Sequence, residues 1–170
     1  MEDKILESFA YVLPALVTGG VAYLFFKSLI KKGTHEKSIE VLVNKKKEAL
    51  RIKLNAYERM LLFCERINPS KILLRVKPVS DITSDYLQLL IANIEQEFEH
   101  NMVQQIYISD ACWSIIVTSK GALLNKLREI AKNVTTANEL RETVLIHYSK
   151  ELPPSDTAIS FIKSEVKKIL

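Results

Sequence analysis

Residues capable of acid–base or metal chemistry are concentrated between positions 95 and 100, where the sequence reads Glu95, Glu97, Glu99 and His100. Glu97 and His100 form an E-x-x-H pair, the spacing that ferritin-like helices use to hold two metal ions. Such a site needs a second E-x-x-H and two further glutamates on facing helices, and the sequence contains no second E-x-x-H. We therefore predict no metal and no cofactor, and we interpret the pattern as a polar helix face with one carboxylate–imidazole pair.

Motifs for nucleophilic catalysis and phosphate binding are missing from the sequence. There is no G-x-S-x-G, and Cys64 and Cys112 lie in apolar helical patterns, which predicts small buried core residues rather than activated thiols. Gly33 and Gly121 stand alone, so no glycine loop can cradle a phosphate. We predict that the protein is not an enzyme, and we assign no catalytic residue.

The uncharged run from Ser8 to Phe26 bears on where the protein acts. A membrane-spanning helix needs about 20 mostly apolar residues, and this run has 19. The chain begins with a net acidic segment, whereas a signal peptide begins with basic residues. We predict one transmembrane helix within residues 1–32, with a buried core helix as the alternative.

Positive charges next to this run predict its orientation. Lys4 precedes the run, and Lys27, Lys31, Lys32 and Lys37 follow it. Because basic residues favour the cytoplasmic side, we expect a single-pass protein of the bacterial inner membrane with a periplasmic N-terminus and a cytoplasmic C-terminal domain. We expect Lys27, Lys31 and Lys32 to contact anionic lipids.

Small residues within the run fall on one helix face. Ala15, Gly19 and Ala22 are spaced by four and three positions, which allows a second helix to approach closely. We predict a helix–helix contact here, although such residues are also common in membrane helices generally.

Basic charge is concentrated in the first part of the chain after this run. Residues 27–80 carry 14 Lys or Arg against 5 Glu, whereas residues 81–170 carry 9 against 12 acidic residues. In a helix perpendicular to the membrane, Lys45, Lys46 and Lys47 lie about 28 Å beyond Lys27, far outside a Debye length of about 8 Å. They indicate a solvated face, an anionic partner such as RNA, or a helix lying along the membrane surface.

Helical periodicity continues through most of the remaining sequence. Residues 35–48 are more polar than the segment that follows, as in a stalk. From residue 49 two apolar stripes predict a broadly buried helix that Pro69 ends. Residues 71–79 are strand-like but have no partner, so we predict an extended connector. Four further helices follow. The predicted N-cap of the first is Asp81 or Ser84, and that of the second is Ser109 or Asp110. The third begins with a capping box of Thr136 and Glu139, and the fourth is capped by Ser155 or Asp156.

These patterns predict an all-α fold. It has one N-terminal transmembrane helix, a long basic helix and a small cytoplasmic helical bundle. The corresponding domains are a membrane anchor at residues 1–32, a basic helical stalk at residues 33–48 and a helical domain at residues 49–170. Near the end of the long helix lies a charged seam, in which we expect Glu58 to pair with Arg66, or Glu65 with Arg75.

Two segments carry a resemblance to a known family. AYERMLLFCERINPSKILLRV at residues 56–76 and EQEFEHNMVQQIYISDACW at residues 95–113, together with the N-terminal span, resemble an uncharacterised family of small membrane-anchored proteins of Bacteroidetes. The family lends no functional residues, and it implies a bacterial inner membrane and a helical cytoplasmic domain. It also points to a polar helix-to-helix corner as an interaction surface, formed by Glu97, Glu99, His100, Gln104 and Gln105.

These observations together predict an accessory or scaffolding subunit of a larger inner-membrane complex that acts by protein–protein contact. We expect other integral membrane proteins and anionic lipids as partners, with self-association left open. The alternative is a membrane-tethered adaptor for an anionic partner such as RNA or the ribosome, bound through Lys45, Lys46 and Lys47, although the sequence carries no signature of a nucleic-acid-binding module.

Overall fold

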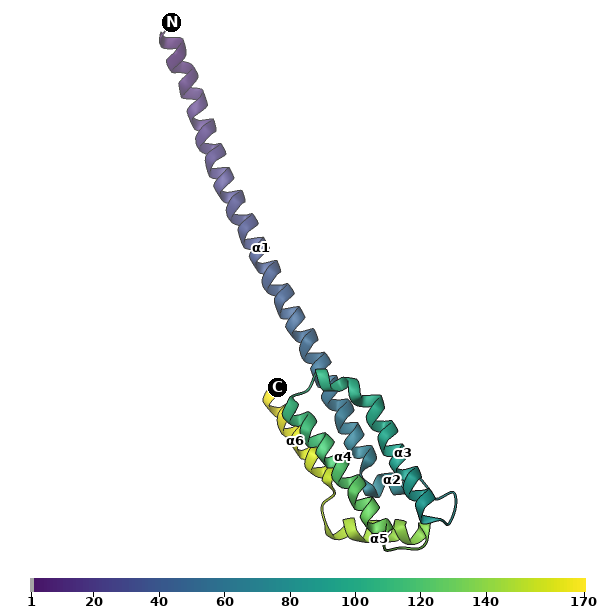
Figure 1. The fold of residues 1–170 in the computed structure, drawn as a ribbon. Helices are drawn as coiled ribbons and strands as arrows, with labels where there is room; N and C mark the ends of the chain where they lie inside the picture. Colours follow the sequence, from purple (N-terminus) through teal and green to yellow (C-terminus); the bar gives the residue numbers. More distant parts are fainter. Residues whose placement is uncertain (1) are drawn as a thin grey trace. The chain divides into compact units, whose positions relative to one another are not determined.

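The chain is all-helical, as predicted. A computed structural model describes the backbone of residues 2–170 and the side chains of residue 14, residues 16–30 and residues 39–170. Over this backbone there are α-helices and one 3₁₀ helix, with no strand beyond an isolated bridge between Ile82 and Thr136 (Figure 1). The chain divides into two compact units, which we call the N-terminal unit (residues 1–49) and the C-terminal unit (residues 50–170).

The first helix, α1, extends from Glu2 to Ile67. It continues as a helix through Gly33 and Thr34. It ends just before Asn68, whose backbone is extended (φ −52°, ψ 128°) because proline at position 69 disfavours helical geometry in the preceding residue.

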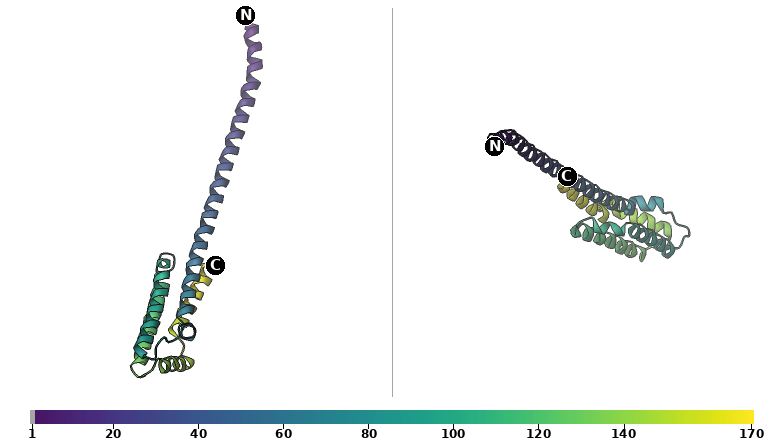
Figure 2. Two further views of the ribbon diagram at one scale, coloured as in Figure 1. Left: turned by 90° about the vertical axis from the view of Figure 1, so that its right-hand side faces the viewer. Right: turned by 90° about the horizontal axis from the view of Figure 1, so that it is seen from above.

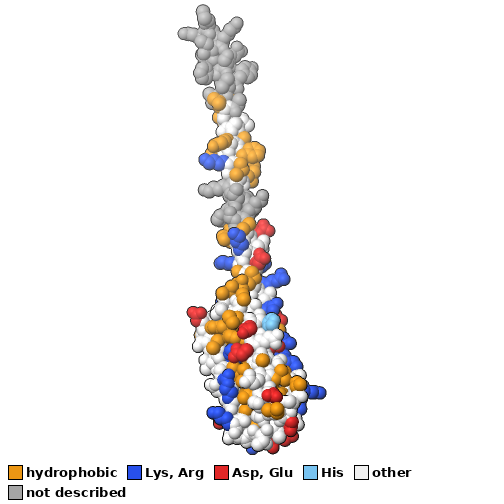
Figure 3. Space-filling model, turned by 45° about the vertical axis from the view of Figure 1, so that its right-hand side comes forward, with side chains coloured by type: hydrophobic (Ala, Val, Ile, Leu, Met, Phe, Trp, Pro, Cys, Tyr) orange, Lys and Arg blue, Asp and Glu red, His pale blue; other side chains and the backbone are white. Residues whose placement is uncertain are grey.

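The predicted transmembrane helix is not confirmed. Among the residues whose side chains are described, no helix is both long enough and apolar enough to cross a membrane. Residues 8–13 and 15 of the uncharged run lie outside the described side chains. Within the described part, Leu16, Leu24 and Phe26 are 63–69% exposed, and Figure 3 shows apolar side chains on the helix surface.

The C-terminal unit is a helical bundle around one apolar core. In Figures 1 and 2, α3, α4 and α6 lie alongside the last turns of α1, and α5 crosses one end of the bundle. The elements after α1 are α2 (Pro69–Arg75), α3 (Thr83–Asn101), η1 (Met102–Ile106), α4 (Asp110–Ala131), α5 (Ala137–Lys150) and α6 (Pro154–Ile169). The largest fully buried side chains are Tyr57, Tyr86, Phe63, Met60, Ile67, Ile72, Leu73, Leu90, Ile94, Ile116, Leu123 and Leu127.

The extended connector predicted at residues 71–79 is wrong over its first half, which forms α2. The side chain of Asn68 accepts a hydrogen bond from the backbone N–H of Ser70 (3.1 Å), and Pro69 occupies the first helical turn. Proline is well suited to this position because its fixed φ is helical and its missing N–H is not needed there. The same proline therefore both ends α1 and begins α2.

Two of the four predicted N-caps are confirmed. Ser109 caps α4 by accepting from the N–H of Cys112 (3.1 Å), and Thr136 with Glu139 forms the predicted capping box of α5. The caps predicted for α3 and α6 are wrong. Helix α3 follows Ile82, whose extended backbone bridges to Thr136, and α6 begins at Pro154 after Pro153.

Candidate interaction site

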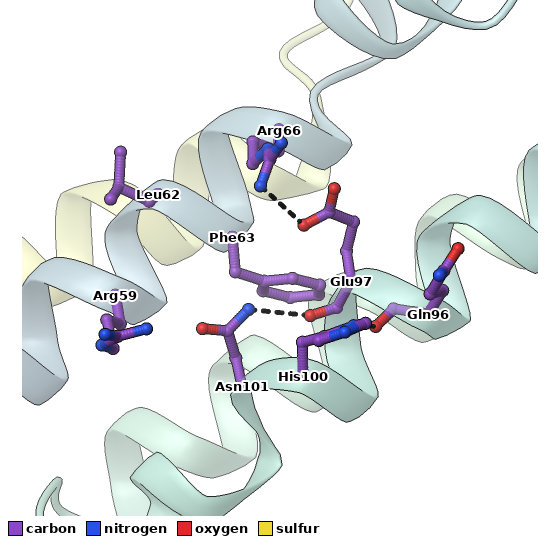
Figure 4. A pocket seen from close by; sticks show the side chains of 8 residues that line it. All are labelled: Arg59, Leu62, Phe63, Arg66, Gln96, Glu97, His100 and Asn101. Atoms are coloured by element: carbon purple, nitrogen blue, oxygen red, sulfur yellow. Dashed lines mark hydrogen bonds and ion pairs between the residues drawn. The ribbon is translucent and has the colours of Figure 1, made fainter.

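A polar groove of about 420 Å³ lies between α1 and α3 within the C-terminal unit (Figure 4). Helical spacing brings its α1 residues onto one face, because residues three, four and seven apart are neighbours on a helix surface. The residues that line this α1–α3 groove are Arg59, Leu62, Phe63 and Arg66 from α1, and Gln96, Glu97, His100 and Asn101 from α3.

Glu97 is the electrostatic centre of the groove. Its carboxylate contacts Nη1 of Arg66 at 3.1 Å and Nη1 of Arg75 at 3.4 Å, and its side chain is only 20% exposed. The predicted pairs Glu58–Arg66 and Glu65–Arg75 are therefore wrong, since both arginines bind Glu97. Glu58 and Arg66 are eight positions apart on one helix, about 12 Å along its axis.

The predicted carboxylate–imidazole pair of Glu97 and His100 is also wrong. The Nδ1 atom of His100 lies 2.7 Å from the backbone oxygen of Gln96, and the amide nitrogen of Asn101 donates to the backbone oxygen of Glu97 at 2.8 Å. Among the described residues no three His, Cys, Asp or Glu side chains are grouped to hold a metal ion. The residues lining the groove include no hydroxyl or thiol nucleophile, so their chemistry is that of ion pairing and hydrogen bonding.

The predicted helix-to-helix corner is less polar than its sequence suggests. Glu99 and Gln105 are exposed and Gln104 is half-buried, and none of the three lines the α1–α3 groove. In η1, Val103 and Ile106 are also exposed. The structure therefore brings Glu97 and His100 together in the groove and leaves the other predicted residues on a mixed surface.

Predicted contact residues of the N-terminal unit are exposed where the structure describes them. Gly19, Ala22 and Lys27 lie on the helix surface, and a Cβ atom added at Gly19 would meet no atom within 4 Å. The side chains of Ala15, Lys31 and Lys32 lie outside the described residues.

The three consecutive lysines Lys45, Lys46 and Lys47 are all exposed. Successive residues of an α-helix are rotated by about 100° around its axis. The three side chains therefore leave the helix in three different directions and do not form one flat patch.

A hydrogen-bond network joins α1, α4 and α6 on the face of α1 opposite the α1–α3 groove. It was not predicted from the sequence. The hydroxyl of Ser109 donates to Glu165 at 2.5 Å, and the hydroxyl of Tyr57 donates to the same carboxylate at 3.2 Å. The hydrogen bond from Ser109 is the largest cause that lowers the pKa of Glu165, while burial raises the pKa of Tyr57. The N-cap of α4 thereby connects α1 to α6, and only its Ser109 cap could be predicted from the sequence.

Lys120 of α4 is a largely buried lysine, with a side chain only 14% exposed. Its ammonium group contacts Glu95 at 2.6 Å and lies 4.0 Å from the ring centroid of Phe98. Phe98 in turn stacks on Trp113, with ring centroids 5.3 Å apart. A cation paired and placed over an aromatic ring is compatible with a partly buried position, so this lysine has a packing role.

Both cysteines are core residues, as predicted. Cys64 and Cys112 are free and fully buried. Burial raises the pKa of Cys64 to about 12 and that of Cys112 to about 11. Since the thiolate is the reactive form, neither thiol is activated for nucleophilic chemistry.

A protein-family model matches the chain over residues 3–169. No curated protein and no solved structure is matched. The match agrees with the resemblance to an uncharacterised family and carries nothing on the bacterial group or the membrane. The chain belongs to the family of unknown function DUF7935.

Proposed function

We propose that this protein is a membrane-anchored accessory or scaffolding subunit of a larger inner-membrane complex and acts by protein–protein contact. One observation carries the proposal: the apolar side chains between Leu16 and Ile30 are exposed on the surface of α1. An apolar helix surface of this kind is favourable only when lipid or another protein covers it.

The positions of polar residues support lipid as part of what surrounds the exposed apolar surface of α1. Lys27 lies near one end of the exposed apolar segment, three residues before Ile30, and its Nζ atom is 5.8 Å from the ring centroid of Tyr23. A tyrosine and a lysine together at the end of an apolar helix are typical of the membrane interface. In the proposed orientation Lys27, Lys31 and Lys32 contact anionic lipid, and Ala15, Gly19 and Ala22 face a helix of a partner.

The site chemistry supports contact rather than catalysis. The α1–α3 groove offers arginines, amides and an imidazole but no nucleophile. Both buried thiols have raised pKa values. These groups can recognise a partner without making or breaking a covalent bond.

The proposal is tested by extracting the full chain from membranes of its native cell with a mild detergent and measuring the mass of the particle. We expect alkaline washing to leave the protein in the membrane fraction. We also expect a stable particle larger than a monomer or a simple homodimer, with a defined second component. A freely soluble protein would contradict the membrane anchor, and a clean monomer after mild extraction would contradict the scaffolding role.

A further inference from the structure

We propose that the α1–α3 groove binds an acidic peptide segment of a partner protein, with Arg59 as the carboxylate-binding residue and Leu62 as its apolar neighbour. This inference rests on the proposed role in protein contact and names the chemistry of the partner that the C-terminal unit recognises. It is carried by the charges, the apolar surface and the hydrogen-bonding groups of the groove.

The groove has one arginine more than its own carboxylate can satisfy. Arg66 and Arg75 both contact Glu97, which is the only acidic residue lining the groove. Arg59 forms no ion pair or hydrogen bond with any residue whose side chain the structure describes. The groove lining holds two guanidinium groups, those of Arg59 and Arg66, against the one carboxylate of Glu97. Because Arg66 and, from outside the lining, Arg75 already contact that carboxylate, the guanidinium of Arg59 is left to bind an external anion.

The position of Arg59 separates it from the internal ion pairs. Arg59 and Arg66 are seven positions apart, which is about 10.5 Å along the helix axis. Figure 4 shows the ring of Phe63 between them on α1, facing α3. A ligand carboxylate at Arg59 therefore does not need to displace Glu97 from Arg66 or Arg75.

Side chains rather than backbone groups supply the donors of this groove, which favours a carboxylate over a phosphate. The lining residues lie within α1 and α3, not in the first turn of either helix, so their N–H groups are used inside the helices. Phosphate sites commonly use free backbone N–H groups at helix N-termini or in nests. An arginine guanidinium matches two oxygens of a carboxylate or of a phosphate, so it is the lack of free backbone N–H groups along the groove that favours the carboxylate.

The remaining groups favour a peptide over a small free acid. Leu62 is 53% exposed beside Arg59 and offers an apolar contact next to the charge. Because His100 donates through Nδ1 to the oxygen of Gln96, its Nε2 atom can accept a hydrogen bond in the neutral ring. Asn101 uses its amide nitrogen internally and retains its oxygen as an acceptor. These acceptors suit the N–H groups of a peptide.

The test measures binding of peptides to the full chain in detergent micelles. The probe is an array of 12-residue peptides that place Glu and Leu at every mutual spacing, with matched arrays in which Gln or Lys replaces Glu. We compare the wild type with Arg59→Glu and with Arg51→Glu. Arg51 is exposed on the same helix two turns earlier and does not line the groove, so its substitution changes the net charge equally.

We expect selected Glu–Leu peptides to bind the wild type and Arg51→Glu with affinities within about twofold of each other. We expect Arg59→Glu to lose at least about tenfold, and the Lys-containing counterparts to bind this variant in their place. Circular dichroism of each variant checks that the helical fold is retained.

Three results would overturn the inference. The first is that no acidic peptide of the array binds. The second is an equal loss for Arg51→Glu, which would indicate unspecific charge attraction. The third is equal competition by free glutamate or inorganic phosphate, which would indicate a simple anion site. None of these results depends on the particle mass after extraction, so the failure of this inference and that of the proposed function are distinguishable.

Discussion

The two units of the chain place apolar residues in opposite environments. In the N-terminal unit every described side chain is exposed, including Leu24 and Phe26. In the C-terminal unit Leu90 and Leu123 are completely buried within one core. Both units are helical, so helix formation alone does not distinguish them.

This contrast teaches that the two units depend on different sources of stability. A helix without tertiary contacts is only marginally stable in water, because packing of an apolar face supplies most of the stability of protein helices. The C-terminal unit supplies that packing itself. The described side chains of the N-terminal unit are all exposed, and the proposed function rests on this apolar surface.

The largest effect is expected from removing a core side chain. Leu90→Ala should lower the free energy of unfolding of the C-terminal unit by about 3 kcal/mol, because it removes buried methyl groups and leaves a cavity. Leu24→Ala removes the same atoms from an exposed site and is the matched control. Chemical denaturation in detergent, followed by the fluorescence of Trp113, measures both, and equal losses would contradict the contrast between the units.

The next largest effect is expected at the Ser109–Glu165 network of α4 and α6. Ser109→Ala removes the N-cap of α4 and a donor to Glu165, and it should lower the free energy of unfolding by about 1–2 kcal/mol. Ser164→Ala is the control, because its hydroxyl is exposed and bonds only to the carbonyl of Phe161 within its own helix. If Ser164→Ala lowered the free energy of unfolding as much as Ser109→Ala, the network would add nothing beyond local helix stability.

Local rules predicted those parts of the fold that depend on neighbouring residues. The capping box of Thr136 and Glu139 and the cap at Ser109 follow from short spacings in the sequence. The start of α3 could not be predicted in this way, because a backbone bridge to Thr136, more than fifty positions away, sets the extended geometry of Ile82.

The candidate site was predicted only in part for the same reason. Glu97 and His100 stood out through their spacing, whereas the partners of Glu97 come from α1 and α2 and are distant in sequence. Arg59 belongs to the charged seam predicted near the end of the long helix, but the sequence does not single it out from the other charged residues there. Its relevance depends on which arginines Glu97 already binds, and only the packed structure gives that information.

A smaller effect is expected from acid, and only in the C-terminal unit. Hydrogen bonds from Thr135 and Thr136 lower the pKa of Glu139 from its ordinary value of 4.5, the backbone N–H of Thr135 contributing most. Folding therefore favours the ionised carboxyl of Glu139. Its contribution to the free energy of unfolding is complete above the ordinary pKa and is lost as the pH falls through the lowered pKa.

Denaturation of the wild type and of Glu139→Gln between about pH 7 and about pH 3 measures this contribution. The stability difference between the two proteins should be largest at neutral pH and should shrink as the solution is acidified. Glu142→Gln on the same helix serves as the control. A difference that stays constant with pH would contradict the role of the ionised carboxyl in the capping box.

The smallest effect on the folded chain is expected at Gly19. A Cβ atom there would meet no atom within 4 Å, so Gly19→Leu should leave the unfolding of the C-terminal unit unchanged. The same substitution should dissociate a partner helix that approaches along Ala15, Gly19 and Ala22, because close packing of membrane helices depends on small residues. Gly20→Leu lies about 100° around the helix and is the matched control. If the particle extracted from membranes kept its mass with Gly19→Leu, the exposed apolar surface of α1 would be covered by lipid alone along this stripe, and the partner contact would lie elsewhere.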